Sequence, residues 1–444
     1  MSTTAPPPAE LAAELAADPA VQRHILRTLV TAQILSGAGL AAGITVGAVL
    51  AKDMLGSTAL AGLPSALFTA GSALAAIMVS RISAARGRRP GLTAGYATGA
   101  VGSVGVIVAA ALDSPVLLFL ALFVYGAGSA TNLQARYAGA DLAAPGHRAR
   151  AISTVLVATT LGGVLGPNLA APTGAVAHAL HLPRLAGPFL LAGLAYTAAA
   201  LVLATRLHPD PMLVARAAAA PAAAAPAAAA PAAEPAAAAP AAASAAEPAD
   251  RPADASTAVV RNRVLLGAQV MVVTQLVMVG VMTMTPVHMH DAGRGTAASG
   301  LVIALHVAAM YLPSPLTGRL VDRHGPLAVG AAACLTLVAA GLLAALAPAH
   351  SVPLLALALV LLGLGWNFGL VSGTAILTDG VPLATRAKTQ GSVDVAVSLS
   401  GATGGLASGA VVDLSGYSVL AFGGGLLALL TLPAIATAAV RSRR

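Results

Sequence analysis

The feature that most constrains this chain is a series of apolar runs, each long enough to cross a lipid bilayer. A transmembrane helix needs about 20 apolar residues to span about 30 Å of hydrocarbon. Only 9% of the residues are charged, against about 25% in soluble domains, which excludes a water-soluble enzyme. The runs predict an all-α integral membrane protein with twelve spans, at residues 27–50, 58–79, 91–112, 115–135, 151–172, 187–205, 263–287, 297–318, 327–347, 352–376, 390–412 and 417–438.

The twelve predicted spans form two sets of six, separated by a segment built largely from Ala and Pro. A proline about every five residues between 221 and 240 interrupts helix, so this linker is predicted to be disordered and partly polyproline-like. The matched halves indicate an internal duplication. We therefore expect a cytoplasmic N-terminal tail (1–26), an N-terminal six-helix bundle (27–206), a cytoplasmic linker (207–260), a C-terminal six-helix bundle (261–440) and a basic cytoplasmic tail (441–444).

The basic residues orient these spans. Cytoplasmic loops of membrane proteins carry an excess of Lys and Arg, and a cytoplasmic N-terminus places 21 of the 24 basic residues on that side. The other three are Lys52, Arg184 and Arg294. The net charge of +8 then reflects the orientation of the spans in the membrane and does not indicate nucleic-acid binding. It predicts a multi-pass protein of the cytoplasmic membrane with both termini cytoplasmic.

What the sequence lacks excludes further classes of protein. Its one cysteine, Cys334, lies in an apolar run, so neither a disulfide framework nor a thiolate metal cluster is expected. The acidic first 26 residues contain no cleavage site, so we predict no signal peptide. No phosphate-binding loop is present, which favours a secondary transporter over an enzyme or a nucleotide-driven pump. We expect a monomer in the bilayer with no cofactor and no nucleic-acid partner; a channel or a receptor is the alternative.

The two halves repeat each other in one pair of loops. After the fourth span come Asp141, Arg148 and Arg150, and after the tenth come Asp379, Arg386 and Lys388 at the same offsets. Carboxylates and guanidinium groups at these cytoplasmic helix ends can form ion pairs between the bundles. The six residues are predicted either to gate transport or to form static interfacial pairs.

A second loop carries a more specific motif. Between the eighth and ninth spans the chain reads Gly318-Arg319-Leu320-Val321-Asp322-Arg323-His324-Gly325. This resembles the signature loop Gly-x-x-x-Asp-Arg-x-Gly-Arg-Arg of the major facilitator superfamily of transporters. The resemblance implies two six-helix bundles working by alternating access, with Asp322 and Arg323 in the gate. The first-half copy, residues 80–89, has Ala84 in place of the aspartate, so a gate built on that aspartate would be asymmetric.

Polar side chains at membrane depth are costly, so each is a candidate functional residue. Asp394 lies six residues past Lys388, about 9 Å along a helix. It is predicted either to couple transport to protons and gate it, or to be structural. The other such residues are Gln33, Asn132, Gln134, Asn168, Gln269, Gln275, His306 and Asn367.

Methionine and histidine give the sharpest pattern. Met278 and Met282 share one face of the seventh span, and His306 and Met310 share one face of the eighth. Thioether and imidazole ligands suit a soft cation, above all Cu(I). The segment His288-Met289-His290 would add ligands at the outer vestibule. The alternative is ordinary packing, because methionine fills irregular cores.

The same pattern resembles the CcoA-type copper importers of this superfamily, which carry Met-x3-Met in helix seven and His-x3-Met in helix eight. The resemblance implies copper uptake through Met278, Met282, His306 and Met310. Those importers also use cysteines, and this chain has only Cys334. Relatives in the same group carry flavins, so proton-coupled transport of an organic solute, by drug efflux or flavin-like uptake, is the second hypothesis.

Overall fold

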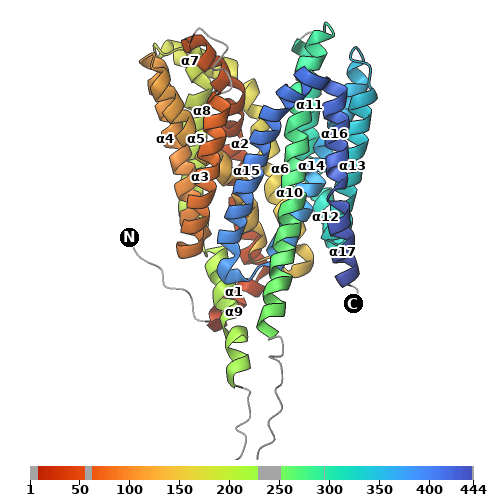
Figure 1. Ribbon diagram of the computed structural model, residues 1–444. Coiled ribbons are helices and arrows are strands. Elements are labelled where there is room, and N and C mark those ends of the chain that lie inside the picture. Colours follow the sequence, from red (N-terminus) through yellow and green to blue (C-terminus); the bar gives the residue numbers. More distant parts are fainter. Residues whose placement is uncertain (1–8, 56–62, 229–251, 295, 443–444) are drawn as a thin grey trace, which may run out of the picture.

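The computed structural model describes residues 9–55, 63–228, 252–294 and 296–442, and all regular structure in these ranges is helical. Two bundles of helices stand side by side (Figure 1). Ten helical stretches in the described ranges are long and apolar enough to cross a membrane. The other two predicted spans, 27–50 and 151–172, fall on helices whose side chains are only partly described. The predicted all-α fold of two six-helix bundles is confirmed.

The first half begins with a helix much longer than its predicted span, because residues 19–26 continue it toward the N-terminus. Its spans are formed by α2 (Pro19–Leu55), α3 (Leu63–Arg86), α4 (Arg88–Ala111), α5 (Pro115–Ala140), α6 (Arg148–Asn168) with α7 (Ala170–Ala179), and α8 (Gly187–Arg206). The ends of the other helices of this half differ from the predicted ends by up to seven residues, as expected where apolar windows define the boundaries.

The second half repeats this order. Its spans are formed by α10 (Pro252–Asp291), α11 (Thr296–Tyr311) with α12 (Ser314–His324), α13 (Pro326–Leu346), α14 (Val352–Gly380), α15 (Leu383–Ser415), and α16 (Tyr417–Leu429) with α17 (Leu432–Ser442). In the part of the chain that the structure describes, three spans are interrupted, and in each a proline lies in the first turn of the second helix: Pro172, Pro315 and Pro433. Proline is tolerated there because the first N–H groups of a helix have no partner within it.

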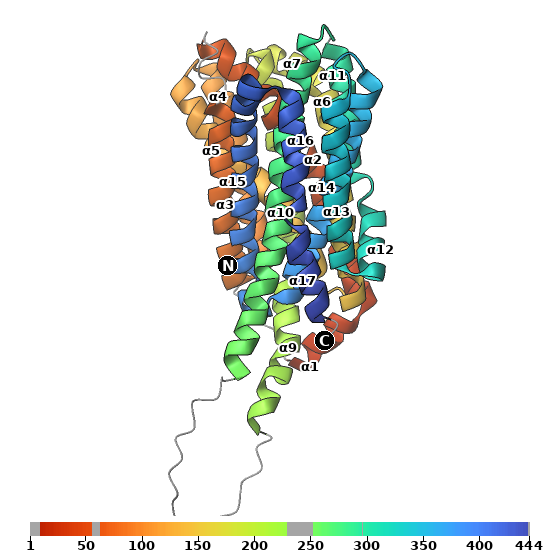
Figure 2. The same cartoon turned by 45° about the vertical axis from the view of Figure 1, so that its right-hand side comes forward.

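One end of the bundle holds the joints α3–α4, α5–α6 and α14–α15, together with the C-terminal residues; we call it the basic end. Here the short helices α1 (Ala9–Ala17) and α9 (Pro211–Ala228) pack against each other (Figures 1 and 2). The segment predicted to be a disordered linker is therefore partly ordered, since 211–228 are helical and α10 starts at 252. Residues 229–251 lie outside the described ranges.

Apolar side chains fill each half separately and also join the two halves. One core lies within the first half and centres on α4, α5 and α8. The other fills the second half and includes Ala149, Ile152 and Leu156 of α6, so it crosses to the first half near the basic end. Cys334 is buried with its Sγ 2.6 Å from Thr431 Oγ1.

Candidate functional site

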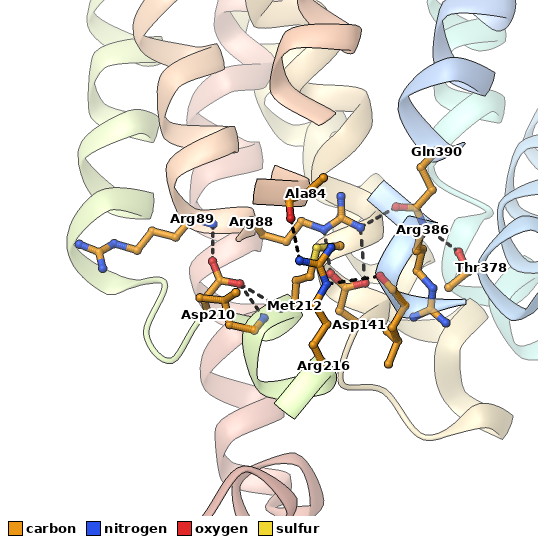
Figure 3. A network of polar contacts seen from close by, with 12 residues as sticks. Ala84, Arg88, Arg89, Asp141, Asp210, Met212, Arg216, Thr378, Arg386 and Gln390 are labelled. Atoms are coloured by element: carbon orange, nitrogen blue, oxygen red, sulfur yellow. Dashed lines mark hydrogen bonds and ion pairs between the residues drawn. The ribbon is translucent and has the colours of Figure 1, made fainter. Parts of the chain in front are cut away.

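Polar contacts between the two halves cluster at the basic end, in two buried layers. In the outer layer, Arg88 at the start of α4 donates from Nε to Asp141 Oδ2 at 2.8 Å. Its Nη2 donates to Gln390 Oε1 of α15 at 2.6 Å (Figure 3). Arg88 and Asp141 are almost completely buried. The pair belongs to the first half, and Gln390 ties it to the second.

The inner layer lies about one helical turn deeper and is built on Arg136 of α5. Arg136 Nη2 donates to Asp394 Oδ1 of α15 at 2.7 Å, and Tyr137 donates from its hydroxyl to the same oxygen at 3.1 Å. Arg136 Nε also donates to Thr374 Oγ1 of α14 at 3.1 Å. The Arg136 guanidinium lies 4.2 Å from the centre of the Tyr137 ring. One buried cation thus holds two helices of the opposite half.

Two further contacts join the halves at the basic end. Asp322 at the end of α12 accepts hydrogen bonds from the backbone N–H groups of Ala149 and Arg150, at 3.1 and 3.2 Å. Its carboxylate therefore lies at the N-terminus of α6, where unpaired N–H groups and the helix dipole favour an anion. Arg148 forms an ion pair with Asp379 across the halves, with both side chains partly exposed.

One residue of each duplicated loop pairs with the other loop across the halves. Arg148 of the first copy meets Asp379 of the second, whereas Asp141 is taken by Arg88. Arg386 is buried and its Nε donates to Val381 O within its own half. The side chains of Arg150, Arg323 and Lys388 are exposed and take no part in the two buried layers.

Sequence reasoning missed the residues at the centre of both layers. Arg88 and Arg136 were counted only among the basic residues that orient the spans, and Gln390 was not singled out. A usable signal was present for Arg136: it lies near the end of a predicted span and precedes a tyrosine. An arginine at that depth needs a buried anionic partner, and Asp394 is the intramembrane carboxylate available to it.

The predicted copper residues lie in the second half, and the His306 ring is held by a helix other than the two predicted to bind copper. Its Nδ1 lies 2.7 Å from the carbonyl oxygen of Leu359 on α14, and its side chain is fully buried. Met278 and Met310 are also buried, and Met282 is half-buried. Met278 and Met310 belong to one apolar core, and Met282 packs against it.

The three predicted vestibule residues point in different directions. His288 stacks on Tyr417 of α16 with ring centres 4.3 Å apart, Met289 is buried in the core, and His290 is exposed. Within the described ranges, no three His, Cys, Asp or Glu side chains are placed to hold a metal ion.

A different group gathers between the seventh, eighth and tenth spans. Trp366 of α14 donates from Nε1 to Gln275 Oε1 of α10 at 2.7 Å. The Tyr311 ring of α11 meets Trp366 edge to face, with ring centres 5.6 Å apart. Gln275 and Tyr311 are half-buried, whereas Trp366 is buried behind them. The accessible part of this group is therefore the Tyr311 ring and the Gln275 amide.

Two homologous six-helix halves, joined at one end by breakable ion pairs, define a secondary transporter. Consistent with this, the sequence pattern of the Major Facilitator Superfamily matches residues 29–313 and 270–444. The chain belongs to the Major Facilitator Superfamily and is a multi-pass membrane transporter, not an enzyme.

The chain is 51% identical over 405 residues to YdeG of Bacillus subtilis, described as an uncharacterized MFS-type transporter, covering 91% of this chain and 89% of YdeG. It is 28% identical over 405 residues to the riboflavin transporter RfnT of Brucella anthropi, covering 90% and 92%. Among solved structures, the human organic anion transporter MFSD10 shares the fold with a TM-score of 0.72 at 16% identity, covering 94% of this chain and all of that one.

Removing the central cation should destabilise the protein strongly. Arg136→Ala leaves the Asp394 carboxylate buried without its counter-ion, and we expect a loss of about 3–5 kcal/mol in the free energy of unfolding. Arg136→Ala combined with Asp394→Ala should lose less than the sum of the single changes, because no charge is then left unpaired. The measurement is unfolding in detergent, followed by the reactivity of the buried Cys334 thiol.

The matched control is Arg150→Ala, which removes the same charge from an exposed side chain at the same end. We expect it to change stability by less than about 0.5 kcal/mol. Equal stabilities of the Arg136 and Arg150 variants would contradict the central role of the inner layer.

Proposed function

We propose that the protein moves a flat, ring-containing organic solute of the flavin type across the membrane by alternating access, and that protonation of Asp394 drives the cycle. The observation that carries the proposal is the group formed by Trp366, Gln275 and Tyr311. It places aromatic surface and a hydrogen-bonding amide on three helices of one half.

The composition makes this group distinctive. The chain has only 6 Phe, 6 Tyr and 1 Trp, and the tyrosines of the first half are used elsewhere. Tyr125 packs edge to face on Phe189 and against Tyr196, within a buried core. Tyr311, supported by the buried Trp366 ring, is therefore the aromatic side chain that this group offers to a solute. Pockets for planar ligands use aromatic walls and a few oriented polar groups.

Asp394 has the environment of a proton-coupling group. Its Oδ1 accepts both the Arg136 and the Tyr137 hydrogen bonds, whereas Oδ2 is buried without a hydrogen-bond partner among the described residues. A proton on Oδ2 would cancel the charge that holds Arg136. Protonation thus weakens the inner layer and favours opening of the basic end.

The similarity to RfnT supports the flavin-type solute. RfnT is a riboflavin transporter that is 28% identical to this chain over nine-tenths of both chains. The residues of the aromatic and amide group, not the family alone, decide whether a related solute is carried here.

We expect Trp366→Ala to lower riboflavin uptake into proteoliposomes by about tenfold. The change removes the ring on which Tyr311 packs and the donor that orients Gln275, and contacts of these kinds are worth about 1 kcal/mol each. Gln275→Ala should also lower uptake. The matched control is Gln269→Ala, since Gln269 lies on the same helix and its Nε2 reaches only Leu430 O at 3.4 Å. Riboflavin uptake equal to that of empty liposomes in the unaltered protein would rule out this substrate.

Asp394→Asn should abolish the response of transport to a pH gradient, since an amide cannot take up or release the proton. In the unaltered protein, acidification of the side from which solute enters should stimulate uptake. The assay compares uptake with and without the gradient for both proteins. A gradient response that survives in the Asn variant would make Asp394 structural.

Copper uptake is the second candidate, and one observation favours it. A carbonyl oxygen only accepts hydrogen bonds, so the His306 Nδ1 facing Leu359 O must carry the proton. The lone pair is then on Nε2, which is buried without a hydrogen-bond partner in the described ranges. Histidine ligands of metals commonly have one ring nitrogen fixed by a carbonyl in this way.

If copper is the cargo, Met278→Ala combined with His306→Ala should lower radiocopper accumulation in cells at least about tenfold, because two soft ligands are lost. His324→Ala is the control, since His324 is exposed at the end of α12. Unchanged accumulation in the double variant would end the copper hypothesis and leave the organic solute.

A further inference from the structure

Equivalent helix ends at the basic end make different contacts in the two halves. In the second half, Asp322 reaches the first N–H groups of α6 in the opposite half. The equivalent position in the first half is Ala84, and α15, the helix it would face, begins at Leu383 without a side-chain cap. A contact that the duplication predicts is thus absent from this pair of helix ends.

Arg216 of α9 lies at this place. Its Nη1 donates to Ala84 O at 2.7 Å, and its Nε donates to Leu383 O at 3.4 Å (Figure 3). Ala84 lies in the last turn of α3, where carbonyl groups have no partner within the helix and a cation is favoured. One side chain from the connecting segment therefore contacts the ends of two helices that belong to opposite halves.

Asp210 fixes the helix that carries Arg216. Its Oδ1 accepts from the N–H groups of Met212 and Leu213 and so caps α9, while its Oδ2 accepts from the N–H of Arg89 in the first turn of α4. Gly87, with φ of 97°, permits this approach, since a Cβ there would lie 2.4 Å from Asp210 Oδ2. Met212 and Val214 are buried. The start of α9 is therefore anchored to the first half.

We propose that α9 is a latch: anchored to the first half by Asp210, it places Arg216 where the signature aspartate is missing and holds the basic end closed. The anchor lies on one half and the Leu383 carbonyl on the other, so the bridging contact exists only while the two helix ends are together. Opening of the basic end must break it. The latch biases the conformational equilibrium whatever the solute is, so it rests on alternating access and not on the proposed substrate.

The test measures the distance between the halves at the basic end, without any solute. Spin labels on Arg86→Cys and Arg323→Cys, both exposed and on opposite halves, report this distance by double electron–electron resonance in a Cys334→Ser background. Arg216→Gln should raise the population with a longer distance by about three- to tenfold, since a hydrogen bond of this kind contributes a modest net stabilisation. Arg206→Gln, which removes an exposed charge ten residues earlier, should leave the distribution unchanged.

Two further variants separate the latch from a general loss of structure. Arg216→Lys keeps the charge but lacks the forked guanidinium group that reaches both carbonyls, so it should shift the distance distribution partly. If neither Arg216 variant shifts the distribution, the proposal is wrong. Ala84→Asp in the Arg216→Gln protein should restore the short distance by capping α15, as Asp322 does for α6. Persistence of the long distance in that protein would show that Arg216 does not stand in for the aspartate.

Discussion

The ion pair between Arg136 and Asp394 is the interaction on which the rest of the arrangement depends. Two opposite charges buried between separate halves of the protein are stable only together, because either one alone is costly to keep out of water. The pair therefore ties α5 to α15 strongly in one state and opposes separation of their ends. Its strength is conditional, since a single proton on the carboxylate removes it. A transporter needs a contact of this kind, firm in one state and released by a chemical event.

The fold was predictable because a bilayer imposes a length and a hydropathy on every span. The halves, their order and the positions of nearly all helices follow from the apolar runs. The course of the connecting segment did not follow, because its Ala and Pro composition hid the capping aspartate and the buried Met212 that start α9. Local composition describes a chain in solution, whereas α9 is held by a surface made of residues far away in the sequence.

The contacts between the halves were predictable in kind but not in their pairing. Recurring offsets of acidic and basic residues marked helix ends at which the two halves meet, and Asp394 was singled out by its depth. The partners could not be assigned, because the spacing along one helix says nothing about which helix of the other half lies opposite. Arg148 therefore pairs with Asp379 across the duplication, and Asp141 with Arg88 of its own half. Internal symmetry identifies equivalent positions, and tertiary packing decides which of them meet.

The same reasoning bears on the substrate. A pattern such as Met-x3-Met and His-x3-Met fixes which side chains share a helix face, but not which faces meet. In the structure, the His306 ring is oriented by the Leu359 carbonyl of α14, and Met278 and Met310 lie in the apolar core to which Trp366 also belongs. Side-chain contacts join Trp366, Gln275 and Tyr311 from three helices. Recognition of a solute requires groups that converge from several helices, because a single helix face surrounds nothing. This contact between side chains of three helices is the physical reason for proposing an organic solute.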